Sequence, residues 1–367
     1  MPPLAKDQAM RASPQAAGVK ANALTHELQH ERLLRGPERS GKRYALGLPW
    51  ESFARAWSLA EDRLARLEQQ LLSSDLRHSW ICRADFKEVS ALVALEGESV
   101  AIEDLVLVDA QSLPSRPTPA WIKAKALLSL RRQIGRAGPA KTLTAEGLLG
   151  LEHRLAEILD EGAEGDEPVE GELMEDGRRT ASMDRLRRWL DVVGELESTP
   201  AVPAAAMALR VWQRIKPLDR YGAEIGLLLA PLLLWHWGKT KGMTVCLAAG
   251  LLETRRQLDN ATPLDAWMRQ FCEAVQVAAN AGLDEHHSIA RGRARLVELL
   301  SRHGAGSRLP HLAWLFLNYP ALSTRFIKRR LELTAQGSNW LLQELIAEDV
   351  VREITGRPKN RVYSLVS

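Results

Sequence analysis

The feature that most constrains the fold is an apolar spacing of three and four residues that returns along most of the chain. In residues 51–72 the side chains of Phe53, Trp57, Leu64 and Leu67 fall close to one face of a helix, with Glu and Arg on the other. Helical spacing of this kind also covers 83–110 (broken at Gly97), 119–134, 182–196, 204–215, 262–283 and 288–304. Strand signals are scarce before residue 350, so we expect a mainly α protein with an all-α body.

One apolar run, the 11 residues from Ile225 to Trp235, raises the question of a membrane span. A helix that crosses a bilayer needs about 20 apolar residues, so this run is expected to be a buried core helix. The first 31 residues contain no apolar stretch typical of a secretory signal. The three cysteines, Cys82, Cys246 and Cys272, are widely spaced, as is usual for reduced thiols. We therefore expect a cytoplasmic protein with no membrane partner.

Composition divides the chain into three parts. Residues 1–43 are rich in Ala, Gln, Lys and Arg and are expected to be a flexible basic N-terminal arm. Residues 44–305 are expected to be the all-α domain, interrupted by an acidic flexible loop, 158–180. Nine acidic residues fall between Asp160 and Asp176, a composition that favours a solvated loop over a binding tract. Residues 306–367 are expected to form a separate C-terminal module.

Three helices are expected at the start of the C-terminal module. Pro310 stands where the first would begin, and Ser323 and Thr334 are good N-caps for the second and the third. In the third helix the spacing points Leu341 and Leu345 inward. The polar residues of that helix are expected to be exposed, namely Gln336, Ser338, Asn339 and Gln343. The second helix carries the cations Arg325, Lys328, Arg329 and Arg330.

Two β-like runs follow these helices. Val350 to Thr355 and Val362 to Val366 flank a turn, Gly356 to Arg361, with three cations in six residues: Arg357, Lys359 and Arg361. Three helices followed by a two-stranded ribbon with a basic tip have the order of a winged helix-turn-helix. The last 16 residues are therefore expected to be the wing.

The chemistry of this module suits double-stranded DNA. Residues 301–367 contain ten Lys and Arg against five Asp and Glu, a charge of +5, so the rest of the +3 chain carries −2. Amide side chains can make bidentate contacts to adenine in a major groove, and cations meet phosphates. The residues predicted to bind DNA are Lys328, Arg329, Gln336, Ser338, Asn339, Gln343, Arg357, Lys359 and Arg361. The alternative for such a module is a protein–protein joint.

Metal ligands are not expected. Asp284, Glu285, His286 and His287 are adjacent in sequence, but neighbouring histidines do not share a helical face and no further His or Cys stands at ligand spacing. A polar turn between two helices explains this cluster better. We expect no metal and no cofactor.

Several short motifs resemble those of a known family. "REITGR" after a Thr-capped helix resembles the end of bacterial Fic-type proteins that carry a C-terminal winged helix, and "ALEGESVAIEDLVLVDA" resembles an "EGE" segment found early in many of them. The stretch "RIKPLDRYGAEIGLLLA" stands where those proteins have His-Pro-Phe-x-x-Gly-Asn-Gly-Arg between two helices, and Pro217 and Leu218 match in position and type. Residues 44–367 thus resemble an uncharacterised Fic-related helix-turn-helix family of rhizobia and related bacteria. The resemblance implies a Fic-like helical bundle followed by a small winged helix-turn-helix domain.

The departures from the Fic signature bear on activity. The resemblance implies transfer of AMP from ATP to a protein hydroxyl, with the signature histidine as general base. Lys216 stands in its place, and a lysine in water is protonated at neutral pH and is a poor base unless desolvated. The anion-binding part of the signature reads Tyr221, Gly222, Ala223 and Glu224, which puts a carboxylate where a cation should hold phosphate. The vestigial motif consists of Lys216, Pro217, Leu218, Asp219, Arg220 and Gly222.

Together these patterns predict a bacterial DNA-binding regulator of transcription with a catalytically degenerate Fic-like domain, and no catalytic residues are expected. A homodimer is left open as a second partner. One alternative is a nucleotidyl-transferring Fic-type enzyme with a substituted active site that uses Lys216 and Arg220 as phosphate clamps. Another is a protein-interaction scaffold whose C-terminal module docks a partner chain.

Overall fold

A computed structural model defines the fold. It describes residues 48–109, 117–160, 172–256, 258–302, 307–356 and 361–366. Residues 1–48 and 49–367 are two units, and every helix and strand named below belongs to the second. The N-terminal arm expected at 1–43 lies outside the described residues.

The second unit is mainly helical, as the spacing predicts. The helices of its first part are α2 (Trp50–Leu72), α3 (Arg77–Leu95), α4 (Ile102–Asp109), α5 (Pro119–Thr142), α6 (Ala145–Asp160) and α7 (Glu172–Glu195), with a 3₁₀ turn η1 (Leu196–Ser198). They are followed by α8 (Ala201–Ile215), α9 (Gly222–His236), α10 (Leu247–Thr254) and α11 (Leu264–Leu300). The C-terminal module contains α12 (Leu309–Asn318), β1 (Leu322–Ser323), α13 (Thr324–Arg330), α14 (Ala335–Ala347), β2 (Val351–Glu353) and β3 (Val362–Leu365).

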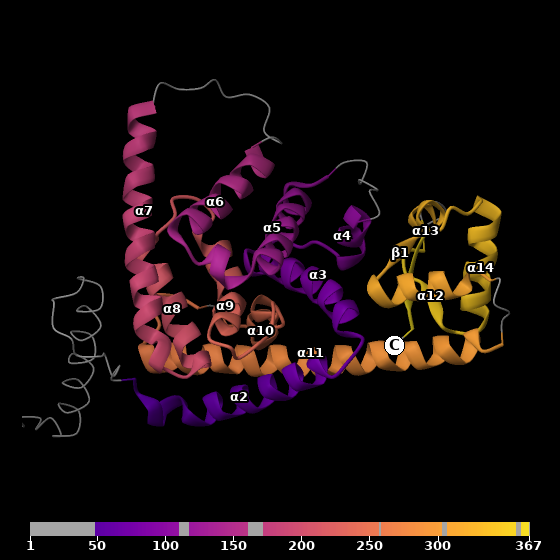
Figure 1. The fold of residues 1–367 in the computed structure, drawn as a ribbon, viewed down its shortest axis with the longest axis horizontal. Coiled ribbons are helices and arrows are strands. Elements are labelled where there is room, and N and C mark those ends of the chain that lie inside the picture. Colours follow the sequence, from indigo (N-terminus) through magenta and orange to yellow (C-terminus); the bar gives the residue numbers. More distant parts are fainter. Residues whose placement is uncertain are drawn as a thin grey trace, which may run out of the picture. The chain divides into compact units, whose positions relative to one another are not determined.

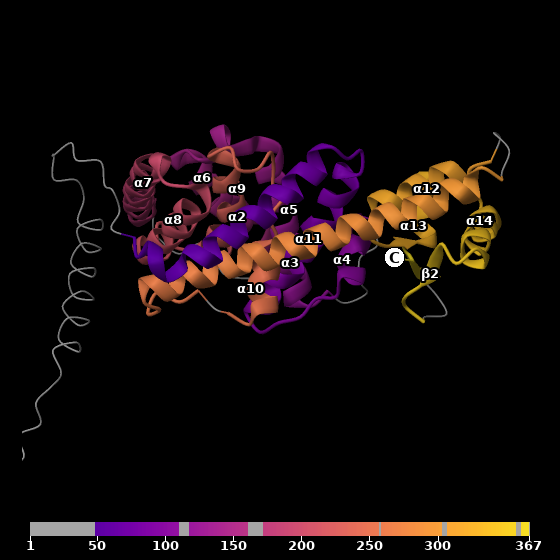
Figure 2. The same ribbon diagram turned by 90° about the horizontal axis from the view of Figure 1, so that it is seen from below.

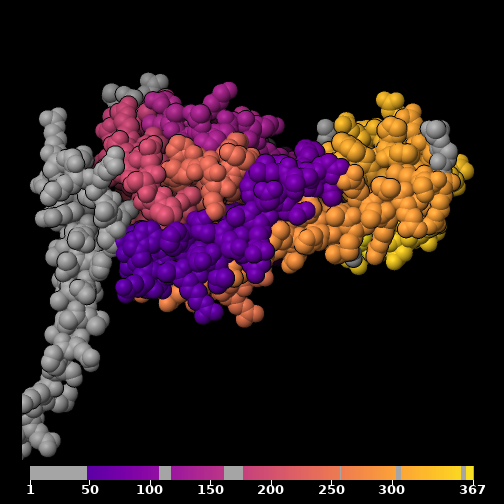
Figure 3. Space-filling view, turned by 60° about the horizontal axis from the view of Figure 1, so that its bottom comes forward, coloured from indigo at the N-terminus to yellow at the C-terminus, as the bar shows by residue number. Residues whose placement is uncertain are grey.

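Helix α11 is the longest of the described helices, and it packs against α2, α3, α8, α10 and α12. It runs beside α2, and α12 to α14 gather near its C-terminal end (Figures 1 and 2). In the space-filling view the indigo α2 and the orange α11 lie next to each other on one face (Figure 3). Phe53, Leu64, Leu67 and Leu71 of α2 are buried, so its apolar stripe is the face that packs.

The apolar run from Ile225 to Trp235 forms the middle of α9. Leu228, Leu232 and Leu233 of this helix are buried, which confirms the expected core helix. None of the described helices combines enough length with enough apolar character to span a bilayer.

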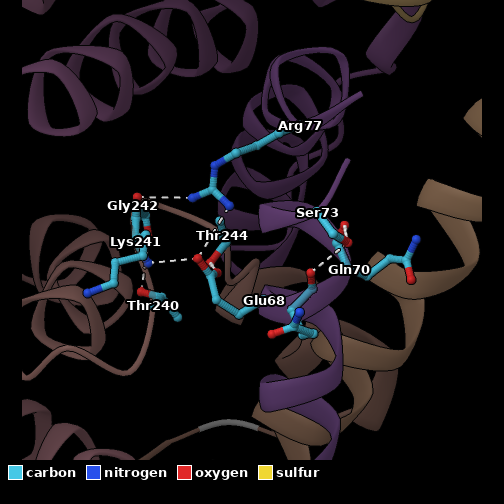
Figure 4. A network of polar contacts seen from close by, with 9 residues as sticks. Glu68, Gln70, Ser73, Arg77, Thr240, Lys241, Gly242 and Thr244 are labelled. Atoms are coloured by element: carbon cyan, nitrogen blue, oxygen red, sulfur yellow. Dashed lines mark hydrogen bonds and ion pairs between the residues drawn. The ribbon is translucent and has the colours of Figure 1, made fainter. Parts of the chain in front are cut away.

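A buried polar network fixes the segment between α9 and α10. Glu68 of α2 accepts hydrogen bonds from the backbone N–H of Lys241 (2.9 Å) and the hydroxyl of Thr244 (2.8 Å) (Figure 4). Arg77 pairs with Glu68 (3.3 Å) and donates to the carbonyl of Lys241 (3.0 Å). Arg131 of α5, fully buried, donates to the carbonyl of Met243 at 2.8 Å. The bond to the Met243 carbonyl is buried and satisfies a backbone group that would otherwise have no partner.

Helix α10 begins on a buried carboxylate. Glu88 of α3 accepts from the backbone N–H groups of Ala248 (3.0 Å) and Ala249 (3.2 Å), in the first turn of α10. The first N–H groups of a helix have no partner inside the helix, so Glu88 acts as a tertiary cap. Burial raises the pKa of Glu88, with Arg131 and the backbone N–H groups opposing the shift.

The C-terminal module has the chain order helix, strand, helix, helix, strand, strand. Its three strands form an antiparallel sheet in the order β1-β3-β2, with Leu322 opposite Tyr363 and Val351 opposite Leu365. A further bond runs from the N–H of Ile354 to the carbonyl of Val362 (2.9 Å). The expected β-ribbon is present, and β1 is an additional strand that the sequence did not predict.

Two expectations about the body are wrong. Asp284 to His287 are not a turn between helices but lie inside the continuous α11. His286 is buried there, and its Nε2 lies 2.8 Å from the hydroxyl of Ser74, at the turn between α2 and α3, so a tertiary contact explains this polar residue. The range 158–180 is not a loop throughout, because α6 extends to Asp160 and α7 begins at Glu172. The acidic stretch between these two helices lies outside the described residues.

Candidate functional site

The outer face of α14 is polar and uncharged. Gln336, Asn339 and Gln343 are exposed, as expected. They stand three and four residues apart, which places them on one stripe of the helix. Trp340 lies on the same stripe with 62% of its surface exposed. Amide groups and one indole are therefore presented together.

Ser338 does not belong to this face. It is fully buried, and its hydroxyl donates to the carbonyl of Ala335 at 3.0 Å. Thr334 caps α14, since its hydroxyl oxygen accepts from the N–H of Gly337 at 3.0 Å. Counted from this cap, Ser338 falls on the inner side with Leu341, Leu342 and Leu345, all buried. The expectation that Ser338 is exposed is wrong, and it is not a contact residue.

Helix α13 presents the cations. Its N-cap Ser323 accepts from the N–H of Phe326 (3.1 Å), and Phe326 and Ile327 are buried. The other side chains therefore face outward, and the exposed residues are Arg325, Lys328, Arg329 and Arg330. Three of them, Lys328 to Arg330, fall in the last turn, where cations also interact favourably with the helix dipole.

The hairpin of β2 and β3 carries further cations. Arg352 is exposed, and Arg361 has 49% of its side chain exposed at 3.7 Å from the carboxylate of Glu353. Such an exposed, long ion pair is weak and leaves Arg361 able to meet another anion. Arg357 and Lys359, predicted at the tip, lie outside the described residues.

A buried arginine joins this module to the body. Arg83 of α3 donates to the backbone carbonyls of Leu317, Phe316 (2.8 Å) and Tyr319 (3.3 Å), at the C-terminal end of α12. A cation at the C-terminus of a helix satisfies its last carbonyls and its dipole. The carboxylate of Glu285 in α11 forms an ion pair with the same guanidinium, with Nε and Oε1 3.4 Å apart. The module is thus attached through directed polar bonds as well as apolar packing.

The vestigial motif forms the connection between α8 and α9. Lys216 caps α8 in the left-handed conformation (φ 48°) and is exposed, whereas Pro217 and Leu218 are buried. Gly222 is the first residue of α9, and its carbonyl accepts from the indole of Trp212 at 2.6 Å.

The side chain of Arg220 in this connection is hydrogen-bonded to Asp160 of α6 and to its neighbour Tyr221. Its guanidinium makes two 2.8 Å bonds to the carboxylate of Asp160 and one of 2.8 Å to the hydroxyl of Tyr221. The hydrogen bonds from Arg220 lower the pKa of Asp160. Asp219 accepts from Arg185 at 2.6 Å. Neither Asp219 nor Arg220 is presented alone to a ligand.

A groove of about 920 Å³ lies between α6, α7 and this connection. Cations and carboxylates line it together. The cations are Arg178, Arg179, Arg185 and Arg220, and the carboxylates are Glu152, Glu157, Asp160 and Asp219. The balance of charge gives no strong field for the phosphates of a nucleotide.

Glu224, which the sequence resemblance aligns with the Fic signature arginine, belongs to a carboxylate–lysine cluster. Lys123 of α5 lies 2.6 Å from Glu224 and 2.5 Å from Glu96. Burial raises the pKa of Glu96, Lys123 opposes this shift and the negative charge of Glu224 adds to it. Hydrogen bonds to the two carboxylates outweigh burial and raise the pKa of Lys123. The cluster uses the carboxylate of Glu224 for internal pairing.

The family and the protein that this chain is similar to carry no description of a function. Residues 180–301 match a family described as a protein of unknown function (DUF1612). The chain is also similar to the uncharacterized protein y4cF of Sinorhizobium fredii (strain NBRC 101917 / NGR234), with 26% identity over 364 residues. That alignment covers 82% of this chain and 93% of y4cF. The similarity to an uncharacterised rhizobial protein agrees with the source expected from the motifs, and neither match names a Fic or helix-turn-helix family.

Sequence reasoning overlooked Trp340. Tryptophan on a helical pattern is usually a core residue, and Trp189, Trp212 and Trp267 follow that rule with 2% exposure or less. The signal available in the sequence was the position of Trp340, which is one residue after Asn339 and four after Gln336 and therefore falls on their face of the helix.

Among the described residues, no group of three His, Cys, Asp or Glu side chains is placed to hold a metal ion.

Proposed function

We propose that this chain is a DNA-binding regulatory protein whose C-terminal module, 306–367, works as a winged helix-turn-helix. The observation that carries the proposal is the pairing of an uncharged, amide-bearing face on α14 with the exposed cations of α13. Amides read base edges in the major groove, and cations bind the phosphates beside it. In this arrangement α14 is the recognition helix and the β2–β3 hairpin is the wing.

The chain order and sheet order of the module support this proposal. A winged helix places a short strand between its first two helices and pairs it with the last strand, and β1 pairs with β3 in this way. The exposed Arg352 and Arg361 stand on the hairpin, on either side of the predicted basic tip. The net charge of +5 in residues 301–367 supports a polyanionic partner.

We further propose that the helical body is a degenerate Fic-like domain without nucleotide transfer. The placement of Lys216 to Tyr221 between two helices supports the likeness. The exposure of Lys216 and the pairing of Glu224 with Lys123 support the loss of activity. The body then has a regulatory role toward the module.

Removing the cations of α13 tests the proposal. We expect Lys328→Ala combined with Arg329→Ala to weaken duplex binding about equally for all sequences and to reduce the slope of log K against log salt by about 2. Fluorescence anisotropy of a labelled random duplex measures both quantities. The matched control removes two exposed cations of α7, Arg178→Ala with Arg179→Ala, and should leave binding nearly unchanged. Equal losses in the two double variants would contradict the assignment of the surface.

A specific observation favours a second candidate, a protein-interaction module. Trp340 and Trp314 expose 62% and 54% of their surfaces, and exposed tryptophans are common at the centres of protein interfaces. This function predicts a complex that survives high salt and a chain that does not retain duplex. The salt response of binding separates the two candidates.

A further inference from the structure

A small cavity lies at the joint between the body and the C-terminal module. It has a volume of about 110 Å³ and lies among α3, α10 and α11, beside the segment that links α12 to β1. Its apolar lining includes Trp80, Ala84, Ala249, Ala278, Ala281 and Pro320. The groove beside the vestigial motif is lined by different residues, so the two are separate sites.

The walls of this cavity are mainly apolar. The indole N–H of Trp80 already donates to the carbonyl of Gly282 at 2.8 Å, so Trp80 offers the cavity its ring and not an unsatisfied donor. Burial raises the pKa of the Cys246 thiol to about 12, so this lining group remains protonated and neutral. The small side chains of α10 and α11 leave the space empty of protein atoms.

The charged residues around the cavity cancel. Arg83 and Glu285 both line it and hold each other at 3.4 Å. Lys87 and Glu253 add one charge of each sign. An ionic ligand would gain no net attraction here and would lose its hydration on entry, so the preferred ligand is neutral.

The volume of the cavity sets the size of the ligand. Dry apolar cavities of about 150 Å³ bind benzene, so about 110 Å³ in a partly enclosed site suits one flat ring. We propose that this cavity is a binding site for a small neutral molecule with a single aromatic ring. This inference goes beyond the proposed function and does not depend on binding to DNA.

A ligand bound in the cavity would affect the contact between the body and the C-terminal module. A ligand in it contacts Arg83, whose guanidinium holds the last carbonyls of α12, and Pro320, whose carbonyl accepts from the hydroxyl of Ser364 at 2.8 Å. Filling the space opposes motion of these groups. Bound ligand is therefore expected to reduce local opening of residues 309–322.

The test uses the full chain with benzene as the probe and benzoate as its charged analogue. Benzene at ten times its Kd should raise Tm by about 2 °C, and it should slow amide hydrogen exchange in residues 309–322. Benzoate at the same concentration should produce neither effect. Benzoate effects as large as those of benzene, or no effect of benzene up to its solubility limit, would overturn the proposal.

A pair of leucine variants on α11 locates the site. Ala281→Leu places a larger side chain in the cavity and should abolish both benzene effects. Ala294→Leu makes the same change at an exposed position of the same helix and should preserve them. Benzene effects that persist in Ala281→Leu, or that disappear in both variants, would place the binding elsewhere. Circular dichroism confirms that each variant is folded before titration.

Discussion

At the scale of single residues, Trp340 is the side chain that matters most to the proposed recognition of DNA. Its indole stands between Asn339 and Gln343 on the exposed stripe of α14 and has 62% of its surface exposed. Adenine is read by bidentate amides and the thymine methyl group by apolar contact. If the proposed function holds, a face made of amides and an indole should favour sites with A·T base pairs.

Thymine methyl groups provide a test of Trp340. In a duplex selected by the protein, replacing thymine by uracil removes a methyl group and keeps the base pair. Each methyl group in contact should be worth roughly fourfold in affinity, about 0.8 kcal/mol. The wild type should lose this factor in a competition assay, whereas Trp340→Ala should be insensitive to the replacement.

Asn339→Ala is the control for this experiment, since it changes the preferred sequence and should preserve the response to uracil. If Trp340→Ala responds to uracil as the wild type does, the indole does not contact thymine.

The environment of Glu88 has a clear consequence for how the free energy of unfolding depends on pH. Glu88 is fully buried, and burial raises the pKa of its carboxyl from 4.5. Between pH 4.5 and the folded pKa, the folded chain therefore binds more protons at this group than the unfolded chain does. The free energy of unfolding contributed by this group falls as pH rises from about 4.5 to the folded pKa and is constant above it.

Glu88→Gln isolates this contribution, because glutamine has the same shape and does not titrate. Urea unfolding of both proteins between pH 4.5 and 8 gives the difference, wild type minus variant. We expect this difference to decrease as pH rises and then to level off. A difference that increases with pH would mean that Arg131 and the helix N–H groups outweigh burial and that the folded pKa is lowered.

At the scale of elements, close approach of helices fixes the packing of α10 on α11. A Cβ built on Gly250 of α10 would lie 2.1 Å from the backbone carbonyl oxygen of Ala274 in α11. Backbone cannot move aside as the tip of a side chain can. Gly250 is therefore required by the contact between the two helices and not by its own backbone angles.

Two glycine variants test this packing. Gly250→Ala should lower the free energy of unfolding by about 2 kcal/mol or more, since overpacking of this kind costs about 1–3 kcal/mol. Gly194→Ala in α7, where no atom lies within 4 Å of the added Cβ, should raise it by about 0.5–1 kcal/mol through helix propensity. Chemical denaturation measures both. A stabilised Gly250→Ala variant would show that α10 and α11 are not in close contact.

The sequence predicted elements better than it predicted their partners. Apolar spacing predicted α2, and the residue types at Ser323 and Thr334 predicted the caps of α13 and α14. Both signals are local in the sequence. The partner of the buried His286 in α11 is Ser74, more than 200 residues away, which no local pattern encodes. Strand β1 was missed for the same reason, since two residues form a strand only through their pairing with β3.

The candidate site was predicted in part. The exposure of Gln336, Asn339 and Gln343 follows from helical spacing, whereas the burial of Ser338 follows from the register that Thr334 sets. The role of Arg83 could not be predicted, because its carbonyl partners on α12 lie more than 230 residues away.

At the scale of the whole molecule, charge is divided between a basic module and a nearly neutral body. The cations of α13 and of the hairpin are exposed, with Arg361 in a long ion pair to Glu353. In the body, Arg83, Arg131 and Arg220 are bound by carboxylates and carbonyls. A polyanion would therefore be drawn to the module. In the proposed function, the body acts on DNA binding through its contact with α12.

The salt dependence of duplex binding tests the central claim most directly. With about five phosphate contacts, log K for a random duplex should fall linearly with log salt with a slope near −4.5, a loss of roughly 500-fold between 50 and 200 mM. Anisotropy of a labelled duplex with the full chain measures this slope. A slope near zero, or no binding at 50 mM salt, would contradict the account.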